Sequence, residues 1–572
     1  MATQSQQATA SPGSRTITGA QALVEALRAQ GVEVIFGYPG AATIPIHDAL
    51  TDSGIRHILT RHEQGAAHAA DGYARATGRV GVCLATSGPG ALNLVTGIAT
   101  AHMDSVPIVA ITGQVATTKL GTDAFQEADT TGVTMPIVKH SFLVKHVSEL
   151  AQAVSDAFVI ASEGRPGPVV IDLPVDVSLA DVESAGTRRR PQRQTNTSRS
   201  WDVARVGEAV RMIDSSQKPL ICAGGGVVAG SGSSALAALA EKTGIPVAYT
   251  LMGKGAFPDS HPLNVGMLGM HGSALANRAA QRCDLFIAVG MRFSDRATGR
   301  ASGFAPGARV VHIDIDPAEM GKMRRPEVPI VCDAGTALGA LADGVRTARR
   351  GEWLRELEQW RHGHRVPRAD SDGRIAPQEV FDALNRVTRG DAIITTDVGQ
   401  HQMWAAQMCT VNHPRRFISS GGLGTMGFGL PAAIGAQIAF PERHVFVVAG
   451  DGSILMNSQE LMTAVENRLP LKILIFNNGY LGMVRQWQQL FYDRRYAATD
   501  ISAQPDFAAL ASAYGAVGLR ARTSGEIEPA MLAAMHVSNR PCVIDFHIVR
   551  EACVTPMIPT GGTVDDMIME PD

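Results

Sequence analysis

Short runs rich in Val and Ile alternate with Ala-rich amphipathic stretches along almost the whole chain. Residues 80–86, 106–112 and 169–173 are apolar runs of this kind, and Gly/Pro turns and a segment of helical spacing follow each of them. Continuous apolar runs are typical of strands that are buried on both faces, as in parallel sheets. The alternation therefore predicts an α/β fold built from doubly wound parallel sheets.

The length of 572 residues is too great for a single hydrophobic core. A basic stretch at 186–200 and a second stretch near 349–372 interrupt the alternation. In the second, apolar residues keep helical spacing (Trp353, Leu354, Leu357 and Trp360) before a charged, His-rich loop follows. The basic stretch could bind nucleic acid, but an interdomain linker explains it fully, and we favour the linker. The predicted parts are a tail 1–15, an N-terminal domain 16–185, a linker 186–200, a middle domain 201–348, a linker 349–374, a C-terminal domain 375–550 and a tail 551–572.

Composition narrows the kind of partner. Hydrophobic residues make up 45%, charged residues 18%, and the formal net charge is -3, so no field of one sign exists to hold nucleic acid or an anionic bilayer. No apolar run reaches the length of a membrane span, and the first fifteen residues lack the apolar region of a signal peptide. The seven dispersed cysteines include no C-x-x-C pair. This pattern predicts reduced thiols and a cytoplasmic location, whereas the weak net charge favours a small-molecule partner.

Polar residues follow two predicted strands of the C-terminal domain. The run 445–449 ends at Gly450-Asp451-Gly452-Ser453, and the run 472–476 ends at Asn477-Asn478-Gly479-Tyr480. Parallel strands deliver both loops to the same edge of a sheet, which is the usual ligand site of open α/β folds. Asp451 and Asn478 supply the oxygen ligands that Mg²⁺ takes beside phosphate, and the two glycines of the first loop let a ligand approach the backbone.

The spacing of this motif is its most specific property. G-D-G alone is as often a plain turn, but here 24 residues separate it from the Asn-Asn pair. That arrangement is the signature of thiamine-diphosphate sites, with the diphosphate held through Mg²⁺ at Asp451, Asn478 and Tyr480.

Glu63 lies where a predicted strand passes into an Ala-rich helix. A glutamate there could merely favour the helix N-terminus. Enzymes that use thiamine diphosphate place a carboxylate in a similar setting against the aminopyrimidine of the cofactor, so that the cofactor can act as its own base. We expect this role for Glu63, and we expect the neighbouring His62 and His68 to serve in packing.

Nearly the whole chain resembles the catalytic subunit of the acetohydroxyacid synthase (acetolactate synthase) family. The resemblance rests on residues 36–41 (FGYPGA), 86–90 (TSGPG), 124–127 (AFQE), 397–404 (DVGQHQMW) and 421–427 (GGLGTMG). It implies that Met426 props the cofactor in a bent conformation and that the Gly424 carbonyl receives the ring amine. The implied ligands of thiamine diphosphate are Glu63, Val398, Gly399, Gln400, His401, Gly424, Met426, Gly450, Asp451, Gly452, Ser453, Asn478, Tyr480, Gly482 and Met483.

The middle domain resembles the FAD domain of the same family. Gly224-Gly225-Gly226 follows an apolar run, but it is weak as a dinucleotide fingerprint because Ala229 occupies the third position and no clear ribose acid follows. In synthases of this family the flavin is structural. The implied FAD ligands are Arg165, Gly224, Gly225, Gly226, Met270, His271, Gly272, Arg292, Asp295, Arg296, Asp314, Ile315, Asp333, Gly421 and Gly422.

The resemblance implies a complete reaction. Pyruvate is decarboxylated and its two-carbon unit is joined to a second pyruvate or to 2-ketobutyrate, the first common step toward branched-chain amino acids. Glu63, Gln126 and Gly40 are the expected catalytic residues, and Phe125, Gln126, Arg292, Met483 and Trp487 are expected to contact substrate. The family also implies a homodimer or homotetramer with shared active sites, and a small regulatory subunit.

Three positions depart from the family pattern. The family usually has Lys at Val175, Asp at Ser294 and Gly at Cys332. Val175 removes a charge near the entrance of the expected site.

Other functions remain as alternatives. One is a flavin-linked pyruvate oxidase or another acetyl-transferring relative such as a sulfoacetaldehyde acetyltransferase, and another is a non-catalytic paralogue. A glyoxylate carboligase is disfavoured because that enzyme lacks the glutamate found here at Glu63. Trp487 could also be a residue that only packs its helix.

Overall fold

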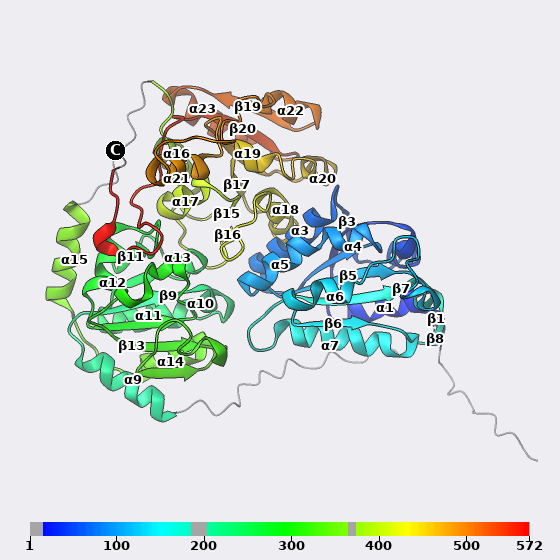
Figure 1. Ribbon diagram of the computed structural model, residues 1–572, viewed down its shortest axis with the longest axis horizontal. Helices are drawn as coiled ribbons and strands as arrows, with labels where there is room; N and C mark the ends of the chain where they lie inside the picture. Colours follow the sequence, from blue (N-terminus) through cyan, green and yellow to red (C-terminus); the bar gives the residue numbers. More distant parts are fainter. Residues whose placement is uncertain (1–14, 185–202, 364–372, 571–572) are drawn as a thin grey trace, which may run out of the picture. The chain divides into compact units, whose positions relative to one another are not determined.

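The computed structural model describes residues 15–184, 203–363 and 373–570. Contacts between residues divide these into two compact units: the first contains the described residues up to 184 except 75–79, and the second contains the rest. Each unit is described by itself. Three six-stranded sheets occur, one in the first unit and two in the second, and every pairing within them is parallel. The predicted α/β class with three parallel sheets is confirmed (Figure 1).

The sheet of the first unit has the strand order β3-β2-β4-β5-β7-β6. A short antiparallel pair, β1 (Thr16–Thr18) with β8 (Asp181–Glu183), joins the two ends of this unit. Leu23, Ile46 and Phe158, on three different helices, pack on one face of the sheet. The strands are β2 (Val34–Tyr38), β3 (Arg56–Leu59), β4 (Gly81–Ala85), β5 (Ile108–Gln114), β6 (His140–Leu143) and β7 (Val169–Pro174). The helices are α1 (Gly19–Ala29), α2 (Ile44–Thr51), α3 (Glu63–Thr77), α4 (Pro89–Asn93), α5 (Val95–Asp104), α6 (Thr130–Thr134), α7 (Leu150–Ser162) and α8 (Val175–Leu179).

The middle sheet has the strand order β11-β10-β9-β12-β13-β14. Its strands are β9 (Pro219–Ala223), β10 (Val247–Tyr249), β11 (Asn264–Met267), β12 (Leu285–Val289), β13 (Arg309–Asp314) and β14 (Val328–Val331). Its helices are α9 (Val203–Ser215), α10 (Gly225–Ala229), α11 (Ser233–Thr243), α12 (Ala274–Arg282), α13 (Asp295–Thr298), α14 (Ala334–Gly344) and α15 (Gly351–Gly363).

Helix α15 lies inside the stretch 349–374 that the sequence assigned to a linker. Its Trp353 and Leu357 are buried with α12 in one hydrophobic cluster, and the indole N–H of Trp353 donates to the Pro219 carbonyl at 3.0 Å. At least this part of the stretch therefore covers one face of the middle sheet. The other predicted domain bounds stay predictions.

The C-terminal sheet has the strand order β16-β15-β17-β18-β20-β19. Its strands are β15 (Ile393–Thr396), β16 (Phe417–Ser419), β17 (Val445–Gly450), β18 (Lys472–Asn477), β19 (Val517–Ala521) and β20 (Cys542–His547). Its helices are α16 (Pro377–Thr388), α17 (Gln400–Met408), α18 (Gly429–Ala439), α19 (Asp451–Ile454), α20 (Glu460–Glu466), α21 (Gly482–Phe491), α22 (Phe507–Ala513) and α23 (Ser524–His536). The strands predicted at 445–449 and 472–476 are confirmed as β17 and β18, which pair directly.

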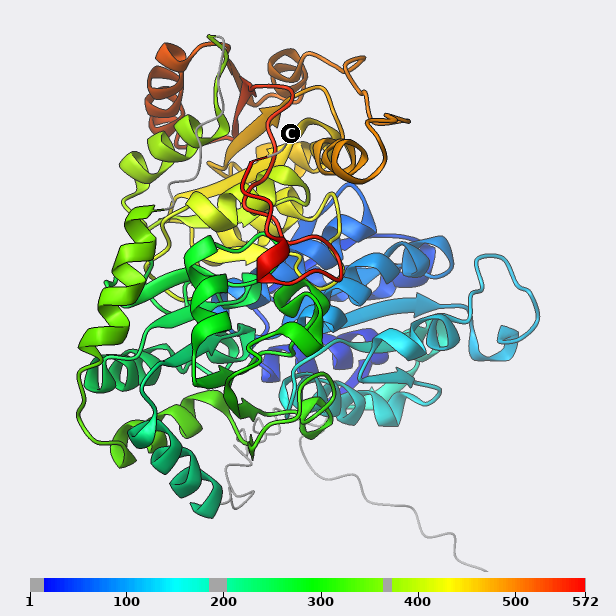
Figure 2. The same ribbon diagram turned by 60° about the vertical axis from the view of Figure 1, so that its left-hand side comes forward.

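The described residues after 550 form a segment that contacts the middle domain. Met557 and Ile568 pair in an antiparallel bridge. The Ile558 N–H donates to the Met270 carbonyl at 2.8 Å, and the Arg300 N–H donates to the Gly562 carbonyl at 2.9 Å. The segment predicted as a C-terminal tail is therefore bound to the middle layer. Figure 2 shows it in red beside the green middle layer.

No helix among the described residues is long and apolar enough to cross a membrane.

Candidate active site

Four loops meet at the carboxyl edge of the C-terminal sheet. They follow β15, β16, β17 and β18, and they carry Asp397, Gly424, Asp451 and Asn478 in that order. The expectation that the loops around Asp451 and Asn478 leave the same edge is confirmed, because β17 and β18 are parallel neighbours. Most of the residues predicted to bind thiamine diphosphate are thus brought together by this one edge.

Asp451 is buried at the start of α19, with 2% of its surface exposed. The Gly479 N–H donates to Oδ2 at 2.7 Å and the Gly452 N–H donates to Oδ1 at 3.1 Å. Burial raises the pKa of Asp451 to about 7. A divalent cation beside it would restore the carboxylate form, because opposite charge favours ionisation.

Asn478 lies beside this carboxylate on the next loop. Its Oδ1 accepts from the Tyr480 N–H at 3.0 Å and its Nδ2 donates to Gln400 Oε1 at 3.2 Å. Within the described ranges no three His, Cys, Asp or Glu side chains are grouped to hold a metal. A magnesium ion at Asp451 would therefore depend on amide, backbone and phosphate oxygens, which is the ligand set that Mg²⁺ commonly uses.

Gln400 connects the cofactor loops to helix α21. Its Nε2 donates to Gln486 Oε1 at 2.9 Å and to the Ala552 carbonyl at 2.8 Å. A Cβ at Gly482, the first residue of α21, would stand 2.0 Å from Gln400 Oε1. Gly482 is therefore required for the close approach of this helix. Met483, the next residue, packs against the hydrophobic core of the C-terminal sheet.

Buried Asp397 and Asn457 hold the loop 420–427. The Gly427 N–H donates to Asp397 Oδ1 at 2.6 Å, and Asn457 Nδ2 donates to the Gly427 carbonyl at 2.7 Å. Burial raises the pKa of Asp397 to about 6. Gly424 has a φ of 69°, a left-handed conformation that favours glycine. Met426 is half-buried on the same loop.

His401 is enclosed by glycines at the same edge. A Cβ at Gly399 or at Gly450 would stand 2.8 Å from its ring. Burial lowers the pKa of His401 to about 3, so the ring is neutral. Its Nε2 is buried without a hydrogen-bond partner among the described residues. Ser453 Oγ accepts from the Gly450 N–H at 3.1 Å and completes the turn. A buried carboxyl, an unsatisfied imidazole nitrogen and a glycine-lined turn fit a bound diphosphate and its cation.

The first unit brings the three predicted catalytic residues to one place. Glu63, the first residue of α3, is 9% exposed, and Asn93 Nδ2 donates to its Oε2 at 3.0 Å. A Cβ at Gly90 would lie 3.2 Å from Glu63 Oε1 and 2.8 Å from the Thr86 methyl.

Gly40 and Gln126 join the same group through their backbones. A Cβ at Gly40 would stand 2.5 Å from Thr86 Cβ, and a Cβ at Gly88 would stand 2.7 Å from the Gln126 carbonyl oxygen. The loop 86–90 is therefore the common neighbour of Gly40, Glu63 and Gln126. Phe125 is 89% exposed beside Gln126. Arg165, predicted to contact flavin, is half-buried and donates through Nε to Ser105 Oγ at 2.8 Å.

The glycines after β9 have a structural explanation. A Cβ at Gly224 would stand 2.1 Å from the Gly290 carbonyl oxygen, and one at Gly226 would stand 2.7 Å from Gly290 Cα. The loops after β9 and β12 thus pack backbone against backbone. This packing brings the N-terminus of α10 and the Arg292 loop together at the carboxyl edge of the middle sheet.

The remaining flavin candidates of the second unit lie in loops that follow strands. Asp314 is the last residue of β13, and Ile315 comes directly after it. Asp333 follows β14, and Met270, His271 and Gly272 follow β11. His271 is buried, its Nδ1 has no partner within the described ranges, and burial lowers its pKa to about 4. Ile315 is an apolar side chain that stays 36% exposed at this edge. An unsatisfied imidazole and an exposed apolar side chain at one edge fit a flat heteroaromatic ligand.

Gly421 and Gly422 follow β16 of the C-terminal sheet and extend toward the middle layer. A Cβ at Gly421 would stand 2.4 Å from the sulfur of Met252. These two glycines therefore lie where the C-terminal layer meets the middle layer, which carries the other flavin candidates of this unit.

Trp487 is half-buried on α21 and contacts the middle layer. The Arg296 guanidinium lies 5.6 Å from the centroid of its ring, and Phe491 packs against it edge-on at 5.7 Å. Arg296 also reaches Met270 Sδ at 3.7 Å and Thr560 Oγ1 at 3.4 Å. Its neighbour Asp295 is exposed. Arg296, predicted as a flavin ligand, thus contacts Trp487, the residue of α21 that is expected to contact the acceptor substrate.

The departures from the family pattern occupy surface or boundary positions. Val175 begins α8 and is half-buried, Ser294 is exposed in front of α13, and Cys332 is half-buried after β14. Nothing in their surroundings accounts for these three residues.

Two partners of site residues were not expected from the sequence. Asn93 bonds Glu63 from 30 positions away, and Gln486 bonds Gln400 from 86 positions away. No spacing rule relates these residues, so no sequence signal could have paired them.

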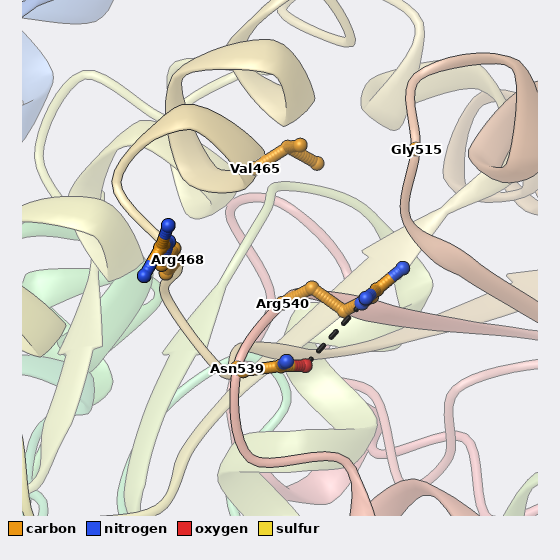
Figure 3. A pocket seen from close by; sticks show the side chains of 5 residues that line it. All are labelled: Val465, Arg468, Gly515, Asn539 and Arg540. Atoms are coloured by element: carbon orange, nitrogen blue, oxygen red, sulfur yellow. Dashed lines mark hydrogen bonds between the residues drawn. The ribbon is translucent and has the colours of Figure 1, made fainter.

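A surface hollow lies away from the candidate site. It measures about 490 Å³ and is bordered by Val465, Arg468, Gly515, Asn539 and Arg540 (Figure 3). These residues precede β18, β19 and β20, so the hollow is at the amino edge of the C-terminal sheet, opposite the candidate site.

Comparison with known proteins matches three family models along the chain. Residues 17–133 match the N-terminal TPP binding domain of thiamine pyrophosphate enzymes, residues 206–341 match their central domain, and residues 397–546 match their C-terminal TPP binding domain. The loops that carry Glu63 and Asp451 lie inside the two TPP-binding matches.

Curated relatives match over nearly the full length. The acetolactate synthase large subunit of Parasynechococcus marenigrum is 50% identical over 97% of this chain and 91% of its own. The acetolactate synthase of Mycobacterium bovis is 48% identical over 96% of this chain and 91% of its own. The acetolactate synthase isozyme 2 large subunit of Escherichia coli is 47% identical over 96% of this chain and 99% of its own.

Proposed function

Because the chain belongs to the acetolactate synthase family of thiamine-diphosphate enzymes, we propose that it forms 2-acetolactate from two pyruvates and 2-aceto-2-hydroxybutyrate from pyruvate and 2-ketobutyrate. This is the reaction that opens branched-chain amino-acid biosynthesis. The observation that carries the proposal is the identity of 47–50% over 96–97% of the chain to proteins named acetolactate synthase.

Thiamine diphosphate is the cofactor of this family. When bound, it supplies the carbon nucleophile and the electron sink that decarboxylation of a 2-keto acid requires. We propose that Asp451, Asn478 and the Tyr480 backbone hold Mg²⁺, and that the turn Gly450–Ser453 with Gln400 and His401 receives the diphosphate. The buried Asp451 carboxyl, with its pKa raised to about 7, supports this assignment, because a cation would stabilise its charge.

Glu63 is proposed to hold and return the proton of the cofactor's pyrimidine ring. Asn93 Nδ2 donates to Glu63 Oε2, which leaves Oε1 for that ring nitrogen. The Gly424 carbonyl would accept the ring amine and Met426 would support the bent cofactor. Proton transfer by a positioned carboxyl is typically worth about 10²–10⁴ in rate.

We propose substrate contacts for residues of each unit, taken separately. Gly40, Gln126 and Phe125 would contact the reacting carbonyl group and the pocket wall. The Arg292 guanidinium would hold the acceptor carboxylate as a fork, since that geometry matches a carboxylate bidentately. Met483 and Trp487 would enclose the acceptor's alkyl group.

FAD is proposed for the carboxyl edge of the middle sheet. The unpartnered Nδ1 of His271 and the exposed Ile315 support it. In this reaction the flavin would perform no net redox step and would serve as a structural group.

The proposed assembly is a homodimer or homotetramer with shared active sites. The term "large subunit" in the names of two relatives supports a small regulatory partner for this chain as well. A cytoplasmic location is proposed from the seven cysteines, all of which are free thiols.

Product analysis tests the function. Purified enzyme with thiamine diphosphate, Mg²⁺ and FAD is given pyruvate alone and pyruvate with 2-ketobutyrate, and both acetohydroxy acids are quantified. Formation of acetolactate, and of acetohydroxybutyrate in the mixture, is the expected result. Acetyl phosphate or acetate as the main product, with pyruvate bleaching the flavin under anaerobic conditions, would identify an oxidase instead.

A further inference from the structure

The loop between β5 and α6, residues 115–129, carries Phe125 and Gln126. Buried Asp172 and half-buried Asp176 fasten the start of the loop, and Gln114 fastens its end. Gln114 Nε2 donates to Asp172 Oδ2 at 3.0 Å and to the Ala128 carbonyl at 2.8 Å. Thr117 donates to Asp176 Oδ2 through Oγ1 at 2.5 Å and through its N–H at 3.1 Å. In Figure 2 the light-blue loop after β5 stands out from the rest of its unit.

A third carboxylate, Glu127, organises the middle of this loop. The Gly121 N–H donates to Oε1, and the N–H groups of Thr122 and Ala124 donate to Oε2 at 3.2 and 3.0 Å. The Glu127 N–H donates back to the Ala124 carbonyl at 2.9 Å. The bond from Gly121 is the main cause that holds the pKa of Glu127 below its ordinary value, so the side chain is a carboxylate at neutral pH. The backbone from Gly121 to Ala124 therefore surrounds the Glu127 carboxylate.

This closed turn determines how Phe125 and Gln126 are presented. Asp123 and Gln126 have φ values of 56° and 59°, a left-handed conformation that is uncommon for residues other than glycine. The Gln126 backbone lies against Gly88, and Gly90 of the same 86–90 loop lies against Glu63. A change in the turn would therefore move Gln126 relative to the Glu63 carboxylate.

We propose that Glu127 is a positioning residue of the reaction, because its carboxylate holds the loop 121–127 in the conformation that presents Gln126 and Phe125. The inference rests on the proposed function for the roles of those two residues. Glu127 itself would touch neither substrate nor cofactor. Displacements on the order of 1 Å can cost about 10²-fold in rate, so loss of the carboxylate should act mainly on turnover.

The test compares three variants of the full-length holoenzyme. Glu127→Ala removes the carboxylate, and Glu127→Gln keeps the shape with one acceptor oxygen. Asp123→Asn is the matched control, because it removes one negative charge from the same loop and keeps the backbone N–H groups that face Glu127. We measure kcat and KM for acetolactate formation, the melting temperature, and the affinity for thiamine diphosphate.

We expect Glu127→Ala to lower kcat by about 10- to 100-fold with unchanged melting temperature and cofactor affinity. Glu127→Gln should fall between it and wild type, and Asp123→Asn should equal wild type. Acetate should partly restore the alanine variant, relative to chloride at equal ionic strength, because the three N–H groups are then free to bind it. Wild-type kcat in Glu127→Ala would overturn the inference, and so would a folded, impaired variant that acetate does not restore.

A second measurement does not depend on activity. Lys119 is exposed at the start of the loop, and trypsin cleavage after it reports how firmly the loop is held. Cleavage should be faster in Glu127→Ala than in wild type and should slow again with acetate. Equal cleavage in both proteins would refute the holding role. A wild-type enzyme that makes no acetolactate would refute the proposed function, and the cleavage result would still decide the role of Glu127.

Discussion

Glu63 allows chemistry to be separated from binding at a single residue. Glu63→Gln keeps the size of the side chain and can still pair with Asn93, but it loses the proton that the carboxyl exchanges. We expect folding and thiamine-diphosphate affinity to stay near wild type while kcat falls by about 10²–10⁴-fold. Steady-state kinetics and a cofactor titration measure the two effects. Near-normal turnover in this variant would falsify the activation role.

For Asp451 we expect the opposite result, because loss of its carboxylate should weaken binding of thiamine diphosphate. Asp451→Ala removes the one carboxylate of the loop after β17, and phosphate and cation are held together in such sites. Saturable, Mg²⁺-dependent binding of thiamine diphosphate should disappear. Titration with and without Mg²⁺ measures this, and Asp565→Ala, at an exposed carboxylate of the same unit, is the control. Unchanged affinity and metal dependence would mean that the C-terminal loops have been misinterpreted.

Helix α21 connects the cofactor loops to the substrate side of the site, and its first residue is the tightest contact. A methyl at Gly482 would meet Gln400 Oε1 at 2.0 Å, and Gln400 cannot simply retreat because Gln486 and Ala552 hold its amide. Gly482→Ala should therefore shift the helix start and weaken thiamine-diphosphate binding.

A second helical glycine gives the matched control for that variant. A Cβ at Gly339, inside α14, meets nothing within 4 Å. Gly339→Ala should leave cofactor affinity unchanged and stabilise by about 0.4–1 kcal/mol. Equal cofactor affinity in both variants would contradict the fit at α21.

Trp487, further along α21, is expected to contact the acceptor substrate and to distinguish 2-ketobutyrate from pyruvate. Trp487 lies between Arg296 and Phe491, as a wall residue would, although packing alone also explains this position. One methylene is worth about 1–3 kcal/mol of discrimination, so a single aromatic wall can supply it. Trp487→Leu should keep acetolactate formation but lower the ratio of acetohydroxybutyrate to acetolactate in mixed-substrate competition. Val484→Ala, at an exposed position of α21, is the control, and an unchanged ratio in an active Trp487→Leu protein would return Trp487 to a packing role.

On the scale of the whole second unit, a buried ion pair joins the middle and C-terminal layers. Lys254 Nζ lies 2.8 Å from Asp259 Oδ2, and the Val411 N–H donates to the same oxygen at 2.8 Å. Burial acts to lower the pKa of Lys254, but Asp259 and the Tyr249 phenol raise it above its ordinary value. Lys254 therefore stays charged at neutral pH, and its contribution to the pair is lost as the pH rises through this raised pKa.

Removing the cation should leave Asp259 largely buried and unpaired. Lys254→Met is expected to destabilise by about 3–5 kcal/mol, as for other broken buried pairs. Arg386→Met breaks the exposed pair with Glu528 and should cost about 0–1 kcal/mol. The midpoints of denaturant unfolding measure both. Equal midpoints would show that the pair does not hold the two layers together.

The sequence by itself determined the elements and the edge at which they deliver chemistry. Apolar runs with short polar loops predicted β17 and β18, and parallel pairing then required Asp451 and Asn478 to meet at one edge. The strand predicted at 106–112 is observed at Ile108–Gln114, because Val106 instead donates to the Ala101 carbonyl and closes α5. Periodicity and turn residues are local properties, so a single chain read in order contains them.

Only the tertiary structure decided which side chains meet. It paired Asn93 with Glu63 and Gln400 with Gln486, and it placed Trp353 of the predicted linker on the middle sheet. It also showed that Gly224 and Gly226 are required by the neighbouring Gly290 backbone, which no dinucleotide fingerprint would indicate. Such contacts join residues that are tens of positions apart. They arise when sheets and helices close a core, and their partners are chosen by packing in three dimensions rather than by spacing along the chain.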